Sequence, residues 1–155
     1  MFNSKYSLFY EQRKIRKKNN AQLLIHFGYI YLIFCTFIGV QKIIVHGSNV
    51  KSCKESLRLT RIFPGIIYSS CGIHPMDSKN VIDDPESWLE FENIAHEPEV
   101  VAIGVCGLDY TRDISDKETQ KEMFRRQIKL ACELQKPILI HERSAQEDVL
   151  EILSR

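Results

Sequence analysis

Five polar side chains that could do chemistry each lie at or just beyond the end of a short apolar run. They are His46, His74, Asp109, His141 and Arg143. Imidazole and carboxylate groups can bind a divalent cation, and imidazolium and guanidinium groups donate charge-assisted hydrogen bonds to phosphate. A lone histidine at such a point is more often a hydrogen-bonded structural residue, so the prediction depends on these side chains meeting in the fold. If they meet, they form a site for a divalent metal and a phosphate-bearing substrate.

The elements that must bring these residues together alternate between apolar runs and amphipathic stretches, which is typical of βαβ units around a parallel sheet. Strands are predicted over residues 43–45, 65–73, 100–105 and 138–140. Ligands of parallel α/β folds lie beyond the carboxyl ends of the strands, where the five residues fall. A complete eight-unit barrel needs about 250 residues. The predicted fold class is therefore α/β, with TIM-barrel-type βα units forming about half a barrel, or alternatively an open sheet.

Each predicted helix has a candidate capping residue, whose side-chain oxygen can accept hydrogen bonds from the free backbone N–H groups at the helix start. The candidates are, in chain order, Asn49 or Ser52, Asp84 before Pro85, Ser115 with Glu118, and Ser144 with Glu147. Apolar residues at helical spacing then predict the buried faces. These faces are Cys53, Leu57 and Thr60; Trp88, Phe91 and Ala95; Phe124, Ile128 and Ala131; and Val149, Leu150 and Leu153.

The N-terminal region differs in composition from the rest of the chain. Five basic residues between Arg13 and Lys18 precede an apolar stretch over residues 21–40. About 20 apolar residues can span a bilayer, and basic residues before the span favour a cytoplasmic N-terminus. The sequence therefore predicts a membrane anchor over residues 21–40, or alternatively a buried strand over residues 29–38.

Charge and cysteine content narrow the function classes only slightly. The formal net charge of +1 argues neither for nor against a nucleic-acid substrate. The five cysteines form no C-x-x-C pair, which indicates a reduced, intracellular protein in the cytoplasm or nucleus. We expect two parts, a basic and hydrophobic segment over residues 1–37 and one domain over residues 38–155.

Several segments of that domain, taken in order and spacing, resemble the TatD family of metal-dependent deoxyribonucleases. The resemblance covers residues 38–155 and is strongest where an apolar run ends in a polar residue. The matching segments are residues 44–49 (I-V-H-G-S-N), 72–75 (G-I-H-P), 101–110 (V-A-I-G-V-C-G-L-D-Y), 127–134, and 137–143 (P-I-L-I-H-E-R).

The resemblance implies a TIM-type barrel that hydrolyses DNA phosphodiester bonds with water activated by Mg²⁺ or Mn²⁺. It places a metal-binding histidine at His141. His74 and Arg143 are candidate phosphate contacts, because an imidazolium and a guanidinium can each donate charge-assisted hydrogen bonds to phosphate oxygens. Asp109 would orient a neighbouring group or fix its loop, and no catalytic base is assigned. The family has a metal-binding glutamate where this sequence has Val105, and valine offers no lone pair to a cation.

The family's later histidine and aspartate ligands correspond to positions beyond residue 155. We therefore expect a metal-dependent deoxyribonuclease whose activity is impaired by Val105 and by the lack of a second half. The alternative is a non-catalytic, truncated barrel. It would associate with itself or bind a partner through its unclosed sheet, or attach to a membrane through residues 21–40.

Overall fold

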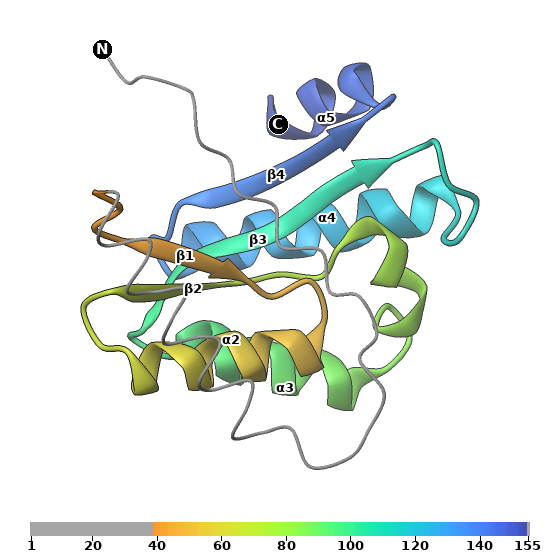
Figure 1. Cartoon of the computed structure of the whole chain (residues 1–155). Coiled ribbons are helices and arrows are strands. Elements are labelled where there is room, and N and C mark those ends of the chain that lie inside the picture. Colours follow the sequence, from red (N-terminus) through yellow and green to blue (C-terminus); the bar gives the residue numbers. More distant parts are fainter. Residues whose placement is uncertain (1–38, 155) are drawn as a thin grey trace, which may run out of the picture. The chain divides into compact units, whose positions relative to one another are not determined.

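In the computed structural model, residues 39–154 are described, and in them strands and helices alternate along the chain (Figure 1). The strands are parallel and lie side by side in the order β1-β2-β3-β4. This arrangement confirms the predicted half-barrel of βα units. The elements are β1 (Ile43–His46), α2 (Val50–Ile62), β2 (Ile67–Cys71), the 3₁₀ helix η1 (Pro75–Asn80), α3 (Pro85–His96), β3 (Val100–Asp109), α4 (Lys117–Glu133), β4 (Ile138–Arg143) and α5 (Gln146–Leu153).

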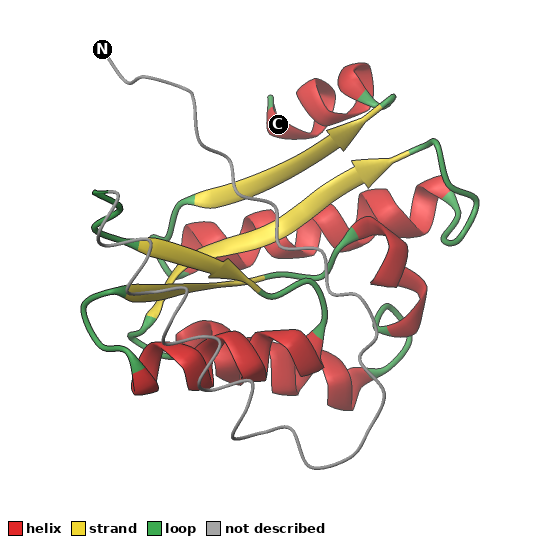
Figure 2. Ribbon diagram, viewed as in Figure 1, coloured by secondary structure: helices red, strands yellow, loops and turns green. Residues whose placement is uncertain are grey.

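Helices α2, α3 and α4 cover one face of the sheet, as Figure 2 shows. The burial of their apolar side chains against the strands drives this layering. The larger core cluster joins residues of all three helices to Cys71 of β2 and Ile103 of β3. A second cluster packs Cys106 and Leu108 of β3 against Phe124 of α4 and the buried face of α5. These two residues alternate along β3 with Gly107 and Asp109, so the Asp109 side chain points to the opposite face.

The predicted starts of the first two helices are confirmed. Asn49 caps α2, because its side-chain oxygen accepts the N–H of Ser52 at 2.9 Å. The Ser52 hydroxyl in turn accepts the N–H of Asn49 at 3.0 Å and closes a capping box. Asp84 caps α3 by accepting the N–H groups of Glu86 and Ser87, with Pro85 at the first helical position.

The predicted capping boxes of the other two helices are wrong. Helix α4 begins after Asp116, whose carboxylate accepts the Thr119 N–H at 2.9 Å. Ser115 is buried instead, and its hydroxyl accepts the N–H of Lys79 in η1 at 3.2 Å. Helix α5 follows Ala145 and has no side-chain cap, because the chain turns at Ser144 with φ of 54°.

The buried face of α5 also differs from the prediction. Val149 is buried as predicted, but Leu150 and Leu153 are 58% and 44% exposed. Ile152 takes the inward position, because a stripe through Ala145, Val149 and Ile152 follows helical spacing from the true start of the helix.

The strand boundaries were predicted only in part. β2 is shorter than residues 65–73, whereas β3 and β4 continue past residues 105 and 140 to Asp109 and Arg143. Their pairing persists because Gly107, Leu108 and Asp109 stay in register with His141, Glu142 and Arg143. As a consequence, Asp109, His141 and Arg143 lie within strands rather than in the loops after them.

Two predictions about the N-terminal region fall outside the described residues. These are the boundary between residues 37 and 38 and all but the last two residues of the apolar stretch at 21–40. Within residues 39–154, none of the helices combines the length and the apolar character needed to cross a membrane.

Candidate functional site at the carboxyl ends of the strands

The ends of β3 and β4 and the segment after β2 bring three of the predicted side chains into contact. The Nε2 atom of His141 lies 3.3 Å from Oδ2 of Asp109. The ring of His74 lies beside that of His141, with 4.6 Å between the ring centroids. The three residues come from three separate βα units, so the predicted convergence at the strand ends is observed. We refer to His74, Asp109, His141 and Arg143 as the rim.

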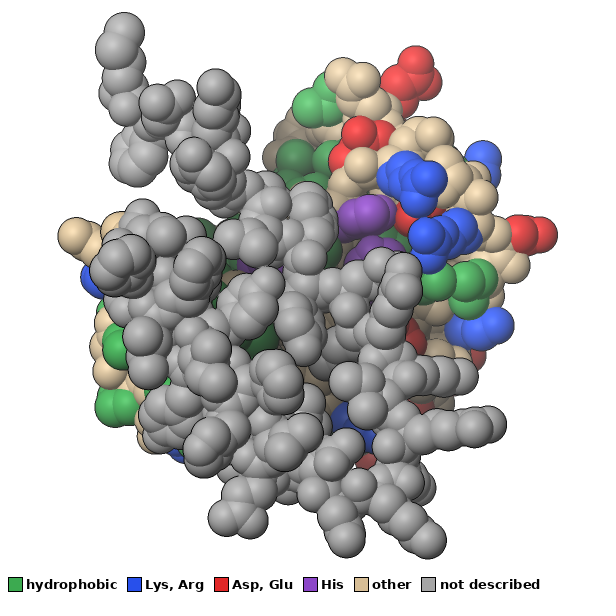
Figure 3. All heavy atoms as spheres, in the orientation of Figure 1, with side chains coloured by type: hydrophobic (Ala, Val, Ile, Leu, Met, Phe, Trp, Pro, Cys, Tyr) green, Lys and Arg blue, Asp and Glu red, His purple; other side chains and the backbone are tan. Residues whose placement is uncertain are grey.

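Arg143 and His46 complete the predicted set, but only Arg143 adjoins the contact. Arg143 is exposed and pairs in strand register with Asp109. Figure 3 shows histidine side chains beside Lys and Arg side chains on the viewed face. His46 is bound elsewhere, since its Nδ1 atom lies 3.0 Å from the Ser70 hydroxyl on β2. The structure therefore gives His46 a hydrogen-bond partner on the neighbouring strand that is not one of the rim residues.

His74 is held by its own backbone surroundings. Its Nδ1 atom accepts the N–H of Met76 at 3.2 Å, which caps η1, and its backbone N–H donates to Ser48 O at 2.9 Å. With Nδ1 as the acceptor, the neutral ring carries its proton on Nε2. Burial lowers the pKa of His74, and the neighbouring His141 lowers it further, while Asp109 opposes the shift. His74 is thus a neutral Nε2–H donor at neutral pH.

Asp109 is the buried charge of the rim. Its side chain is 2% exposed, and Oδ1 accepts hydrogen bonds from the Thr111 N–H at 3.0 Å and the Thr111 hydroxyl at 2.6 Å. Burial acts to raise the pKa of Asp109, but the two bonds from Thr111 and the contact with His141 outweigh it and lower the pKa overall. The carboxylate is therefore ionised and fixed, with one oxygen aimed at His141.

Gly107 allows β3 and β4 to approach closely beside His141. Its φ of +134° lies in a region that favours glycine, and a Cβ atom there would lie 2.1 Å from the backbone oxygen of His141. Val105 precedes it on the same strand and is half-buried. A valine at that position adds bulk but no metal ligand.

The described residues do not fit a metal centre by themselves. No group of three His, Cys, Asp or Glu side chains within residues 39–154 is arranged to hold an ion. Asp109 and His141 already contact each other through Oδ2 and Nε2, the atoms that a cation would need. In addition, Mg²⁺ and Mn²⁺ favour several oxygen ligands, and this pair offers one carboxylate.

Two buried glutamines, to which the sequence pattern assigned no role, bond to backbone groups beside the rim. Gln120 and Gln127 are 2% and 0% exposed, and each bonds through its amide to the backbone of a strand-end segment. The available signal was their spacing of seven residues on a helix whose other inward residues are apolar.

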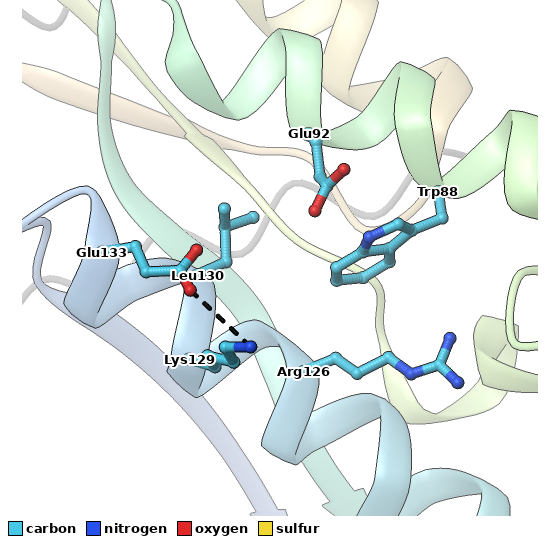
Figure 4. Close-up of a pocket in the computed structure, with 6 residues that line it drawn as sticks. All are labelled: Trp88, Glu92, Arg126, Lys129, Leu130 and Glu133. Atoms are coloured by element: carbon cyan, nitrogen blue, oxygen red, sulfur yellow. Dashed lines mark ion pairs between the residues drawn. The ribbon is translucent and has the colours of Figure 1, made fainter.

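A pocket of about 250 Å³ lies in the helical layer, between α3 and α4 (Figure 4). Its lining includes an ion pair between Lys129 and Glu133 at 3.9 Å and the indole of Trp88. None of the rim residues lines this pocket, so it is separate from the site described above. The full lining is Trp88, Glu92, Arg126, Lys129, Leu130 and Glu133.

Comparison with known proteins places this site in a family. The family model described as TatD related DNase matches residues 34–155. A 3'-5' ssDNA/RNA exonuclease TatD from Salmonella typhimurium is 39% identical over 115 residues, covering 74% of this chain and 43% of that protein. The metal-dependent hydrolase YabD of Bacillus subtilis is 42% identical over 114 residues, with 74% and 44% covered. The chain thus spans less than half the length of these relatives.

Solved structures agree with the sequence comparisons. The TatD homologue YJJV from Escherichia coli superposes with a TM-score of 0.72 at 26% identity, covering 88% of this chain and 52% of that one. An amidohydrolase from Saccharomyces cerevisiae superposes with a TM-score of 0.69 at 28% identity, covering 82% and 44%. The fold, the rim and the matched sequence together show that this chain belongs to the TatD-related DNase family.

Proposed function

We propose that this chain binds nucleic-acid phosphodiesters at the rim and that its metal-dependent hydrolysis of them is weak or absent. The observation that carries the proposal is the contact of His74 with His141 and of His141 with Asp109, beside an exposed Arg143. The nucleic-acid part draws on the Salmonella relative, whose name gives single-stranded DNA and RNA as its substrates.

Two rim groups are suited to bind phosphate. The guanidinium of Arg143 can bond two phosphate oxygens at once, and it is exposed. The Nε2–H of His74 can donate a further bond, because Nδ1 is already occupied by Met76. Asp109 would repel phosphate on its own, but it is buried and paired, so its role is to orient His141.

The weak hydrolysis follows from the side chains that should hold a cation. His141 matches the family's metal-binding histidine, but Val105 stands in the place of a carboxylate. A relative named as a metal-dependent hydrolase supports a metal as the cofactor. The choice of Mg²⁺ or Mn²⁺ comes from the resemblance to the family alone. A non-catalytic binding protein is the second candidate, favoured by Val105.

The test uses the full chain and a fluorescent single-stranded DNA oligonucleotide. In EDTA, Arg143→Gln should weaken binding about tenfold, the loss expected for one charge-assisted contact. Lys129→Gln is the control, because Lys129 is an exposed cation on α4 outside the rim. Equal affinities for wild type and Arg143→Gln would contradict phosphate binding at the rim.

Hydrolysis is measured as nucleotide release with Mg²⁺ or Mn²⁺ for wild type, Val105→Glu and His141→Ala. We expect neither the wild type nor Val105→Glu to release nucleotides faster than His141→Ala. Val105→Glu adds only one carboxylate ligand beside His141, and two ligands hold a cation weakly. Metal-dependent turnover by the wild type that His141→Ala abolishes would show that the present ligands suffice.

Self-association, membrane attachment through residues 21–40 and a cytoplasmic or nuclear location stay predictions.

A further inference from the structure

Helix α4 turns two buried amide side chains toward the strand ends. Gln120 and Gln127 are seven residues apart, which is about two helical turns, so both lie on the inward face. A buried amide needs hydrogen-bond partners, and helix α4 satisfies only one of these bonds itself, from Gln127 Nε2 to Met123 O at 3.3 Å. The remaining bonds of both amides reach backbone groups outside the helix.

Gln127 binds the residue that precedes His74. Strand β2 ends at Cys71, so the peptide groups of Ile73 have left the sheet. Oε1 of Gln127 accepts the Ile73 N–H at 2.7 Å, and Nε2 donates to the Ile73 carbonyl at 3.0 Å. The amide therefore replaces the strand neighbour that Ile73 lacks.

Gln120 binds Asp109 in the same way. The pairing of β3 with β2 ends at Ile103, whereas β3 continues to Asp109. The Tyr110 N–H donates to Arg143 of β4, and successive residues of a strand point their peptide groups to opposite sides. The N–H and carbonyl of Asp109 therefore face away from β4. Gln120 accepts the first at 2.9 Å and donates to the second at 3.1 Å.

We infer that Gln120 and Gln127 are positioning residues that fix His74 and Asp109 relative to each other from one rigid helix. Two turns of α-helix separate the two amides by roughly 10 Å along the axis. Each amide makes paired bonds to one backbone segment, which sets both the position and the orientation of that segment. His141 then takes its place between the two, against the His74 ring and the Asp109 carboxylate.

The functional part of this inference rests on the proposed phosphate binding. The experiment therefore has a first arm that needs no ligand and a second arm that measures DNA binding. The variants are Gln127→Met and Gln120→Met, since methionine is unbranched and fills space without making these bonds. The control is Leu130→Ala, which removes a buried core side chain of the same helix, from a core cluster that contains none of the rim residues. All are compared in the full chain at a temperature where each is folded.

The first arm is nuclear magnetic resonance without any ligand. In the wild type, the Ile73 and Asp109 N–H groups should exchange slowly with solvent, and the His74 and His141 rings should show a through-space contact. Gln127→Met should accelerate exchange at Ile73 alone, Gln120→Met at Asp109 alone, and both should weaken the contact between the rings. Leu130→Ala should leave all three signals in place.

The second arm is the binding of single-stranded DNA in EDTA. Each glutamine variant should bind about tenfold more weakly than wild type, the cost of one misplaced rim contact, while Leu130→Ala binds normally. Rapid exchange of these two N–H groups in the wild type would overturn the inference without any substitution. Folded glutamine variants that keep the contact between the rings and the affinity would also overturn it. If the wild type does not bind DNA, the proposed function fails, and the first arm still decides the positioning role.

Discussion

At the scale of single residues, the rim depends on one buried carboxylate. Asp109 holds His141 through one oxygen and Thr111 through the other, so its ionised form is favoured by partners on both sides. A second carboxylate at position 105 would add one oxygen ligand of the kind that hard cations favour. Valine in that place leaves a rim made of hydrogen-bond donors around one paired acid, which suits an anion better than a cation.

The most constrained residue beside the rim is Gly107. Gly107→Ala should lower the free energy of unfolding by roughly 3 kcal/mol, because it adds a clash with the His141 backbone to an unfavourable φ. Gly65→Ala is the matched control: φ there is +79°, and an added Cβ meets nothing within 4 Å. The control should lose about 1 kcal/mol. Denaturant titration measures both, and equal losses would show that the approach of β3 to β4 does not depend on glycine.

At the scale of elements, capping is decided by where the chain turns and not by the capping motif alone. Asn49 and Ser144 both precede a helix and are both plausible caps from the sequence. Asn49 has extended backbone angles and caps α2, whereas Ser144 has φ of 54° and the N–H of Ala145 is taken by Glu142 at 2.8 Å.

This difference predicts different losses for two alanine variants. Asn49→Ala should lower the free energy of unfolding by about 1 kcal/mol, because the Ser52 N–H loses its partner at the helix start. Ser144→Ala should change it by less than about 0.5 kcal/mol, as for other surface sites. Thermal and denaturant unfolding of the two variants make the comparison. A larger loss of unfolding free energy for Ser144→Ala than for Asn49→Ala would show that Ser144 does cap α5, as the sequence predicted.

At the scale of the whole molecule, the outer side of β4 is one of two sheet edges that have no strand neighbour among the described residues. Within residues 39–154, β4 has a strand neighbour only on the β3 side. Ile140 on this strand is 39% exposed, and Leu150 and Leu153 on α5 are exposed as well. Unpaired strand edges and apolar side chains of this kind favour association with another chain.

We therefore predict that the chain associates with itself in solution. Light scattering should give a mass that rises with protein concentration, and the double variant Leu150→Lys with Leu153→Lys should shift it toward the monomer. Leu89→Lys is the control, because Leu89 is 58% exposed on α3, away from β4. A wild-type mass that stays monomeric across the concentration range would contradict the prediction.

The sequence by itself determined the alternation of strands and helices, the cap at Asp84, the restriction of the α2 cap to Asn49 or Ser52, and the convergence of polar residues at the strand ends. These features follow from local patterns, because hydrophobic period and capping residues act within one turn or one strand. Because the strands are parallel, their carboxyl ends meet at the same edge of the sheet, and this does not depend on the sequences of the loops between them.

The tertiary structure alone decided which polar groups pair across the fold. β3 and β4 stay paired as far as Asp109 and Arg143, because each strand supplies hydrogen-bond partners to the backbone groups of the other. The same need to satisfy buried backbone groups assigns Gln120 and Gln127 to the rim and His46 to Ser70. Such pairings depend on distant neighbours that no local window of sequence contains.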